Sequence, residues 1–443
     1  MEDLEQKCDG QTPEKKGKKG KRVGFILLSV FLALLFFVGG GLTVWFSLDK
    51  QMRTLIKVKT AIDREYYKEV DDDLFYGEIF NAINSNVLDD YSWYMTEEQY
   101  AETKKARTGR RSGVGLTFRV KDENDQPQML IVKVSGNSPA EEAGVLVGDK
   151  IVAFGKTAET LQESVDFNDF SAFLEEQADD SPFFINVARG SENKLLSVCR
   201  SEFVENYVFY KTNEKSYSFT GKSADTLSER GTALPCLGQN TAYIRLTSFN
   251  GNAATTFEKA MEKFKADGKK NLLLDLRENG GGYMDILEKI ASYFCKASSA
   301  KNPVICVADY GEKKEKFKAS GNVYDEYFSK DSRICVLADD GTASASEALI
   351  GCMFDYGTTP YADICLSYRS GVAKTFGKGI MQTTYPVVIG DGAIKLTTAE
   401  LKWPVTGHSI HGRGILPEDG TKTITENYDG DKEIEEAVLK LYL

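Results

Sequence analysis

The chain has 443 residues, of which 42% are hydrophobic and 27% are charged. These values are ordinary for globular protein, and the length allows two or three domains, each with its own core. The net charge of −11 argues against nucleic acid as a partner. Of eight cysteines, seven follow residue 48, and no CxxC pair occurs. This is not a disulfide framework and indicates no zinc site, although one bridge would be compatible with it.

The first predicted element is an apolar segment, residues 23–48, with no charged residue over 26 positions. A helix needs about 20 apolar residues to cross a bilayer, so we predict one transmembrane helix. A cleaved signal peptide is the alternative, but the apolar region is long for one and no small-x-small site precedes Asp49. The lysines and arginine of residues 1–22 predict a basic cytoplasmic tail, with everything after the membrane segment outside the cell membrane.

Residues 49–104 are predicted to form a helical segment, because apolar positions recur at helical spacing. Near its end, Thr96 is followed three residues later by Gln99. This spacing predicts a capped helix start. The segment contains no catalytic pattern.

Residues 105–205 change to short strands and turns, and Asn137–Gly155 predicts a strand, a short helix from Pro139, a glycine turn and another strand. The segments SPAEEAG and GDKIVAFG resemble the helix and following strand of a PDZ domain. PDZ domains bind a peptide's terminal carboxylate at a glycine-rich loop, and the peptide adds a strand to the sheet. The alternative is a small β-domain without a ligand. The resemblance places the peptide-binding loop at Gly113, Val114, Gly115 and Leu116.

Residues 206–443 form the last predicted domain. Its start, 211–235, is polar and predicts a surface loop or linker. From Thr241 strands alternate with helices, which predicts an α/β sheet covered on both faces. One buried strand, Lys270–Arg277, leads into the glycines at 280–282 and a helix. Such a turn exposes amides and lets a substrate backbone approach, and the absence of GxGxxG and GK[ST] spacing disfavours nucleotide binding.

Two further segments of this domain suggest a nucleophile and a base. A helix is predicted to begin near Ser344, where the helix dipole favours negative charge on the serine oxygen. An ordinary N-cap is the alternative. Downstream, Lys374 and Lys378 lie in an apolar run, and burial can bring a lysine pKa to roughly 7–8. Glycines on both sides of Lys378 predict tight packing around it.

Together these segments resemble the C-terminal processing (tail-specific) protease family, serine proteases with a PDZ domain and a Ser–Lys dyad. The matching motifs are Thr-Ala-Ser-Ala-Ser-Glu, FGKG followed by glutamine, DYG, and DLR with a double glycine. The resemblance implies a crotonase/Clp-protease-like α/β protease domain with an inserted PDZ β-domain. It also implies site residues: Ser344 as nucleophile, Lys378 as general base, Gln382 holding that base, Gly281, Gly282 and Ala345 as oxyanion hole, and Asp355 in support.

Two departures from the family pattern stand out. An insertion around TTPYADICLSYRSG lengthens the stretch between Ser344 and Lys378, which leaves Lys374 as a competing base. Glu278 replaces a common asparagine. A histidine-based esterase is a poorer interpretation, because the chain has only two histidines, at 408 and 411, and no GxSxG elbow.

The predicted function is that of a membrane-anchored serine endopeptidase that cleaves proteins whose C-terminal tails, apolar in character, are captured by the PDZ domain. No metal or organic cofactor is implied, and a homo-oligomer is compatible with the pattern. The alternative from another class is a membrane-bound PDZ protein that binds peptides without cleaving them.

Overall fold

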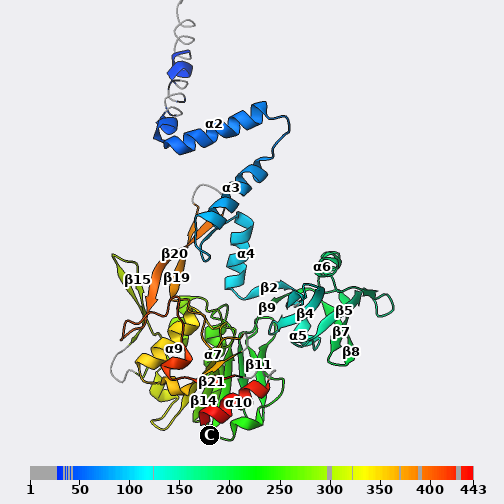
Figure 1. Cartoon of the computed structure of the whole chain (residues 1–443), viewed down its shortest axis with the longest axis vertical. Coiled ribbons are helices and arrows are strands. Elements are labelled where there is room, and N and C mark those ends of the chain that lie inside the picture. Colours follow the sequence, from blue (N-terminus) through cyan, green and yellow to red (C-terminus); the bar gives the residue numbers. More distant parts are fainter. Residues whose placement is uncertain are drawn as a thin grey trace, which may run out of the picture. The chain divides into compact units, whose positions relative to one another are not determined.

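The computed structural model describes residues 27–32, 35, 37, 40, 43–122, 124–296, 302–321, 323–368, 371–387, 392–425 and 431–442 (Figure 1). Two compact units divide the chain, residues 1–82 and 83–443. The first unit contains α2 (Lys50–Glu65) and most of α3 (Asp72–Asn86). Asp49 caps α2 by accepting the backbone N–H of Met52 at 2.7 Å.

The predicted membrane segment at 23–48 lies partly outside the described residues, and the predicted basic tail at 1–22 lies wholly outside them. Residues 27–32 and 43–47 are helical. Within the described ranges, no helix combines the length and the apolar character needed to cross a bilayer.

The second unit begins with the end of α3, followed by β1 (Trp93–Met95) and α4 (Glu97–Arg107). Thr96 accepts the N–H of Gln99, whose side chain in turn accepts the N–H of Thr96, so the predicted capped helix start is confirmed. Strand β1 was not predicted. It pairs with β20 (Ala393–Lys402), which lies far along the chain, and therefore no local sequence pattern predicts it.

Residues 110–204 form a separate β-rich part with its own apolar core. The chain enters and leaves it through two paired antiparallel strands, β2 (Arg110–Gly113) and β9 (Ser201–Val204). The short helix predicted at Pro139 is present as α5. The sheet order is β3-β4-β5-β7-β8, with β6 paired to β5, so that β3 is an edge strand. The remaining elements are β3 (Leu116–Lys121), β4 (Pro127–Val134), α5 (Pro139–Glu142), β5 (Lys150–Gly155), β6 (Gln162–Glu163), α6 (Phe167–Glu175), β7 (Pro182–Arg189) and β8 (Glu192–Cys199).

An eight-stranded sheet of order β12-β11-β10-β13-β14-β17-β18-β21 organises the α/β part, with parallel pairing from β13 to β21. Leu272 and Leu274 of β14 face one core with α7 to α9, whereas Leu273 faces a second core with α10. Both faces are covered, as predicted. The elements are β10 (Val208–Lys211), β13 (Thr241–Leu246), α7 (Ala253–Ala266), β14 (Asn271–Asp275), α8 (Met284–Ala291), β17 (Ile334–Ala338), α9 (Ala345–Asp355), β18 (Ile364–Ser367), β21 (Lys422–Ile424) and α10 (Asp431–Tyr442).

Two sequence interpretations need correction here. The polar segment 211–235 is not a linker, because it contains β11 (Ser216–Thr220) and β12 (Thr226–Glu229), which extend the eight-stranded sheet to its edge. The segment interpreted as an insertion contains β18, a strand with neighbours on both sides. It therefore belongs to the core sheet.

A second sheet of five strands stands beside α8 and α9, with the order β1-β20-β15-β16 and β19 paired to β20. Its other strands are β15 (Val304–Asp309), β16 (Lys314–Lys318) and β19 (Ile380–Pro386). The cysteines in the described part of the chain are free thiols, although Cys295 Sγ and Cys352 Sγ lie 3.1 Å apart.

Candidate active site

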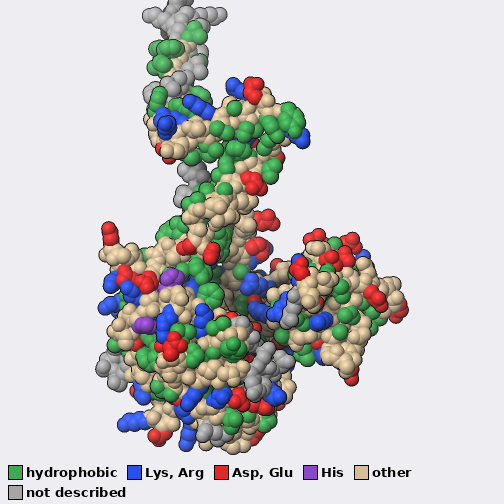
Figure 2. Space-filling model, viewed as in Figure 1, with side chains coloured by type: hydrophobic (Ala, Val, Ile, Leu, Met, Phe, Trp, Pro, Cys, Tyr) green, Lys and Arg blue, Asp and Glu red, His purple; other side chains and the backbone are tan. Residues whose placement is uncertain are grey.

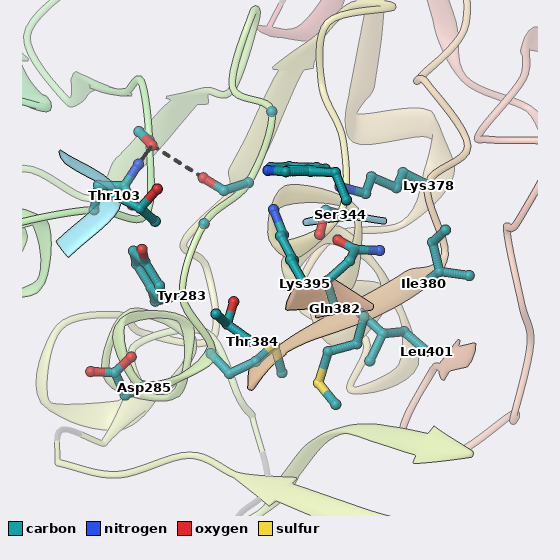
Figure 3. Close-up of a pocket in the computed structure, with 18 residues that line it drawn as sticks. Thr103, Tyr283, Asp285, Ser344, Lys378, Ile380, Gln382, Thr384, Lys395 and Leu401 are labelled. Carbon is teal, nitrogen blue, oxygen red and sulfur yellow. Dashed lines mark hydrogen bonds between the residues drawn. The ribbon is translucent and has the colours of Figure 1, made fainter. Parts of the chain in front are cut away.

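A cavity of about 620 Å³ lies where the glycine turn after β14, the start of α9 and the β19–β20 pair meet (Figure 3). Ser344 and Lys378 line it together with Gln382, as the sequence predicted, and Gly280, Gly281 and Gly282 complete the turn. Lys395 of β20 also lines it. The side chains of Gln382 and Lys395 rise from their strands beside Ser344 (Figure 3).

The glycine turn has a shape that only glycine allows. Gly281 has a φ of 96°, and a Cβ there would lie 2.8 Å from the backbone nitrogen of Ala345. Gly282 has a φ of 151°, and its Cβ would lie 2.3 Å from the carbonyl oxygen of Phe249. Any side chain would force the turn away from α9. The turn is therefore held against the first residue of that helix.

The amides of this turn differ in availability. The N–H of Gly281 donates to Asn279 Oδ1 at 3.0 Å, so this amide already has an acceptor, and its role in an oxyanion hole stays a prediction. The N–H of Phe249 donates to the carbonyl of Gly281, and the N–H of Tyr283 donates to the carbonyl of Phe249. Neither of these hydrogen bonds uses the N–H of Gly282. Ala345 is the first residue of α9, and its N–H has no acceptor within the helix. Gly282 and Ala345 are the two candidate donors that remain.

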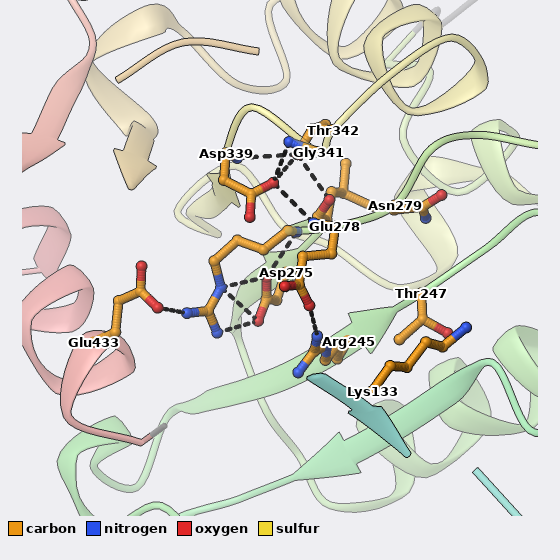
Figure 4. Close-up of polar contacts among 12 residues, drawn as sticks. Lys133, Arg245, Thr247, Asp275, Glu278, Asn279, Asp339, Gly341, Thr342 and Glu433 are labelled. Carbon is orange, nitrogen blue, oxygen red and sulfur yellow. Dashed lines mark hydrogen bonds and ion pairs between the residues drawn. The ribbon is translucent and has the colours of Figure 1, made fainter. Parts of the chain in front are cut away.

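Buried charges hold the strand before the turn (Figure 4). The guanidinium of Arg277 bonds Asp275 at 2.6 Å and also pairs with Glu433 of α10. Burial would raise the pKa of Asp275, but Arg277 outweighs it and holds that pKa well below its usual range. The C-terminal helix is thus connected to the strand that carries the turn.

Asp339 connects the turn to the nucleophile loop (Figure 4). Its Oδ1 accepts the N–H groups of Glu278 at 2.8 Å and Gly341 at 3.1 Å. Thr342, which replaces the family's usual serine, donates its hydroxyl to the carbonyl of Leu276 at 2.8 Å. Burial raises the pKa of Asp339 to about 6. The two loops therefore form one hydrogen-bonded unit.

Ser344 occupies the N-cap position of α9, with φ 57° and ψ −115°. The N-cap interpretation was right about position, yet N-cap residues usually have extended backbone. Positive φ in a residue other than glycine costs roughly 1–3 kcal/mol and is concentrated at functional sites. The backbone at Ser344 therefore indicates more than a cap.

Glu347 is a site residue that the sequence motif contained but whose role we did not predict. Its fully buried carboxylate accepts the N–H of Ser344 at 3.0 Å, the hydroxyl of Thr375 at 2.6 Å, and the N–H groups of Gly377 at 2.8 Å and Lys378 at 2.9 Å. Burial raises the pKa of Glu347, and these hydrogen bonds oppose the rise. A glutamate three residues into an apolar helix was the available signal.

Lys378 approaches the cavity between two glycines, and the predicted tight packing is confirmed. A Cβ at Gly377 would lie 2.9 Å from Gly414 N, and one at Gly379 would lie 2.7 Å from His411 N. The ammonium of Lys378 lies 4.6 Å from the ring centroid of Tyr91. Burial lowers the pKa of Lys378, although the carboxylates of Asp89 and Glu347 act in the opposite direction.

The remaining predicted site residues differ in their position relative to the cavity. Gln382 donates to Thr397 Oγ1 at 3.3 Å. Asp355, predicted as supporting, lies outside the cavity and accepts the N–H groups of Val405 and Thr406, so it fixes a loop. Lys374 does not line the cavity. Neither does His408 or His411; both are exposed, and histidine side chains are visible on the surface in Figure 2.

The predicted peptide-binding loop of the β-rich part has an unusual backbone. Gly113 and Gly115 have φ values of 129° and 83°, and a Cβ at Gly115 would lie 2.2 Å from Ser138 Cβ. Val114 is buried, and its carbonyl accepts the N–H of Ala140 at the start of α5. Leu116 begins the edge strand β3.

Comparison with known proteins agrees with this arrangement. Residues 240–419, which contain Ser344 and Lys378, match the family described as "Peptidase family S41". These residues match that family model, and the predicted resemblance to C-terminal processing proteases is confirmed.

Two relatives from staphylococci extend the similarity. A "Probable CtpA-like serine protease" of Staphylococcus aureus is 27% identical over 377 residues, which cover 84% of this chain and 64% of the relative. The Staphylococcus epidermidis protein of the same description is 27% identical over 387 residues, with 85% and 67% coverage. This chain thus spans about two thirds of each relative's length. Among solved structures, the photosystem II D1 C-terminal processing protease matches 85% of this chain and 93% of its own, with 22% identity and a TM-score of 0.47.

Proposed function

We propose that this chain is a serine endopeptidase in which Ser344 is the nucleophile and Lys378 is the general base. The observation that carries the proposal is one cavity that brings together a strained serine, a half-buried lysine and the glycine turn, which packs against the backbone nitrogen of Ala345. A lysine with a lowered pKa holds its neutral form at a lower pH and can then accept a proton.

In the proposed reaction, the Ser344 hydroxyl attacks a peptide carbonyl while the neutral amine of Lys378 takes its proton. The N–H groups of Gly282 and Ala345 stabilise the oxyanion of the tetrahedral intermediate. Lys378 returns the proton to the leaving amine. Water then attacks the acyl-enzyme while Lys378 takes its proton, the bond between the acyl carbon and Ser344 Oγ breaks, and Lys378 returns the proton to Ser344 Oγ. Gln382, at the cavity wall, positions the lysine chain, and Glu347 fixes the backbones of Ser344 and Lys378 relative to each other.

The β-rich part is proposed to act as a PDZ domain that captures substrate tails. Strand β3 is a sheet edge with backbone groups available for an added strand. Phe118 of β3 lies beside Phe167 and Phe170 of α6, with ring centroids 5.5 and 5.8 Å apart. These aromatic side chains favour an apolar peptide end between β3 and α6. The glycine loop at 113–115 would hold its carboxylate.

Membrane anchoring through residues 23–48, with the catalytic part outside the cell, is retained as a proposal. It is supported by 26 consecutive uncharged residues preceded by a cluster of lysines. Protease added to intact cells should digest the catalytic part and spare the basic tail. Protection of the catalytic part would contradict this orientation.

The peptidase proposal is tested with the full-length chain in detergent micelles. A fluorophosphonate reagent, which labels activated serines, should label Ser344, and a set of peptides that differ at the C-terminus should reveal hydrolysis. Ser344→Ala should abolish both signals, whereas the matched variant Ser409→Ala, in the exposed histidine loop, should keep them. Peptide binding with no hydrolysis at any pH would favour the binding protein instead.

A further inference from the structure

Lys395 is a second lysine in the cavity, and backbone pairing fixes its position. It lies on β20 opposite Trp93 of β1 on one side and opposite Thr384 of β19 on the other. A residue in the middle of three paired strands has little freedom to move its Cα. Its side chain projects into the cavity that holds Ser344 (Figure 3).

The ammonium of Lys395 lies 4.2 Å from the ring centroid of Trp93, within cation–π distance. Among the described residues it forms no ion pair within 4 Å. Lys402, on the same strand, differs: it pairs with Asp309 at 3.0 Å and Glu400 at 3.6 Å. Among the described residues that line the cavity, Asp285 is the one acid, and its carboxylate lies 3.7 Å from the guanidinium of Arg107. The carboxylates of Asp89 and Glu347 act on Lys378, but neither residue lines the cavity and neither forms an ion pair with Lys395.

We propose that Lys395, with its stem against Trp93, is a subsite for a carboxylate that the substrate carries next to the scissile bond. The inference rests on the proposed peptidase function and adds its substrate preference. An unpaired ammonium in a half-buried cavity loses hydration without gaining a counter-ion, and an incoming carboxylate provides that partner. The carboxylate is either a Glu or Asp side chain or the free C-terminus of a tail that has reached the cavity.

The charge state of Lys395 also depends on such a ligand. Burial lowers the pKa of Lys395, and the charge of Lys378 lowers it further. A carboxylate bound to Lys395 opposes both effects and keeps the Lys395 ammonium protonated. The ligand therefore stabilises the charged form of the side chain that binds it.

The test uses four peptides of one sequence: Glu or Gln beside the cleaved bond, each with a free or an amidated C-terminus. With the wild-type full-length chain, the preferred carboxylate should raise kcat/KM about tenfold over its neutral counterpart. Loss on Glu→Gln assigns the side chain, and loss on amidation assigns the C-terminus. Lys395→Met should reduce the preference to less than twofold, mainly through KM. Lys395→Arg should keep it, and so should the matched control Lys402→Met.

Outcomes that contradict the carboxylate subsite differ from those that contradict the peptidase proposal. If the wild type cleaves the four peptides at equal rates, or if Lys395→Met slows all four equally and keeps the preference, the carboxylate subsite is wrong. Fluorophosphonate labelling of Ser344 and an unchanged melting temperature establish that Lys395→Met is folded. If the wild type cleaves none of the peptides and Ser344 is not labelled, the peptidase proposal fails, and the subsite falls with it.

Discussion

The two walls of the cavity are built differently. On the wall formed by the glycine turn and the start of α9, buried polar groups are satisfied by protein partners, as Asp339, Arg277 and Glu347 illustrate. On the opposite wall, Lys378 and Lys395 rest against Tyr91 and Trp93. The first wall fixes geometry, because moving one group leaves others without partners. The second wall carries two ammonium groups whose protonation depends on pH and on the bound substrate. Substitutions in the first wall should therefore affect stability and activity together, and those in the second mainly activity.

The largest effect is expected at the base. Lys378→Ala should reduce turnover by about 10²- to 10⁴-fold with little change in melting temperature. Lys378→Arg should fail as well, because a guanidinium does not release its proton near neutral pH. The double variant with Ser344→Ala should be little worse than either single variant. Lys374→Ala is the matched control, since Lys374 lies outside the cavity. Near-normal hydrolysis by Lys378→Ala would remove the lysine from the mechanism.

The second-largest effect is expected at Glu347, whose carboxylate accepts four hydrogen bonds in the first wall. Glu347→Leu leaves two buried and two part-buried donors without an acceptor, at a cost of about 1–3 kcal/mol for each buried group left unsatisfied. We expect a lower free energy of unfolding and a large loss of turnover together, measured by denaturant titration and peptide hydrolysis. Glu347→Gln keeps one side-chain oxygen and should lose less of both. If Glu347→Leu is as stable as the wild type, the comparison between the walls fails.

Asp339 gives a smaller effect that depends on pH. Its pKa of about 6 in the folded chain exceeds the ordinary 3.8. The neutral carboxyl therefore contributes its full stabilisation below pH 3.8, and this contribution is lost as the pH rises through 6. Asp339→Asn cannot ionise and keeps an oxygen acceptor. Its free energy of unfolding should exceed that of the wild type by up to about 3 kcal/mol at about pH 8 and converge with it below about pH 4. A difference independent of pH would contradict this cause.

The smallest effect on the chemistry is expected from the β-rich part. Gly115→Val places a Cβ against Ser138 and should disturb the loop at the start of β3. Turnover of peptides with an apolar C-terminus should fall severalfold, while fluorophosphonate labelling of Ser344 should change little. Gly144→Ala is a matched control, because Gly144 has a similar positive φ of 81° but a Cβ there meets no neighbouring atom. Equal losses in both assays would mean that the loop supports the fold and not peptide capture.

What the sequence could predict depended on how local the signal was. The cap at Thr96 and the close packing around Lys378 follow from neighbours in the chain, and both are present. The hydrogen bond from the Gly281 amide to the side chain of Asn279 was not predicted, because residue spacing does not reveal such a contact. Lys395 was missed because a lysine in a strand is usually solvated. Only the pairing of β20 with β1 and β19 places it in the cavity.

The polar strands β11 and β12 were missed for a related reason. Strand β12 is the edge of the eight-stranded sheet and β11 is its neighbour, and turn-forming residues in 211–235 dominated the sequence pattern there. The central strand β14 has a continuous apolar run, and it was predicted correctly.

The most direct test of the account is the pH dependence of Ser344 labelling by a small fluorophosphonate, measured in the wild type and in Lys378→Ala. Burial lowers the pKa of Lys378, so the wild-type rate should rise with pH and level off below the roughly 10.4 of a free lysine. Lys378→Ala should remain slow across the same range. A variant with both His408 and His411 replaced by Asn should follow the wild-type curve. If the rise survives in Lys378→Ala, or disappears only in the histidine variant, Lys378 is not the base.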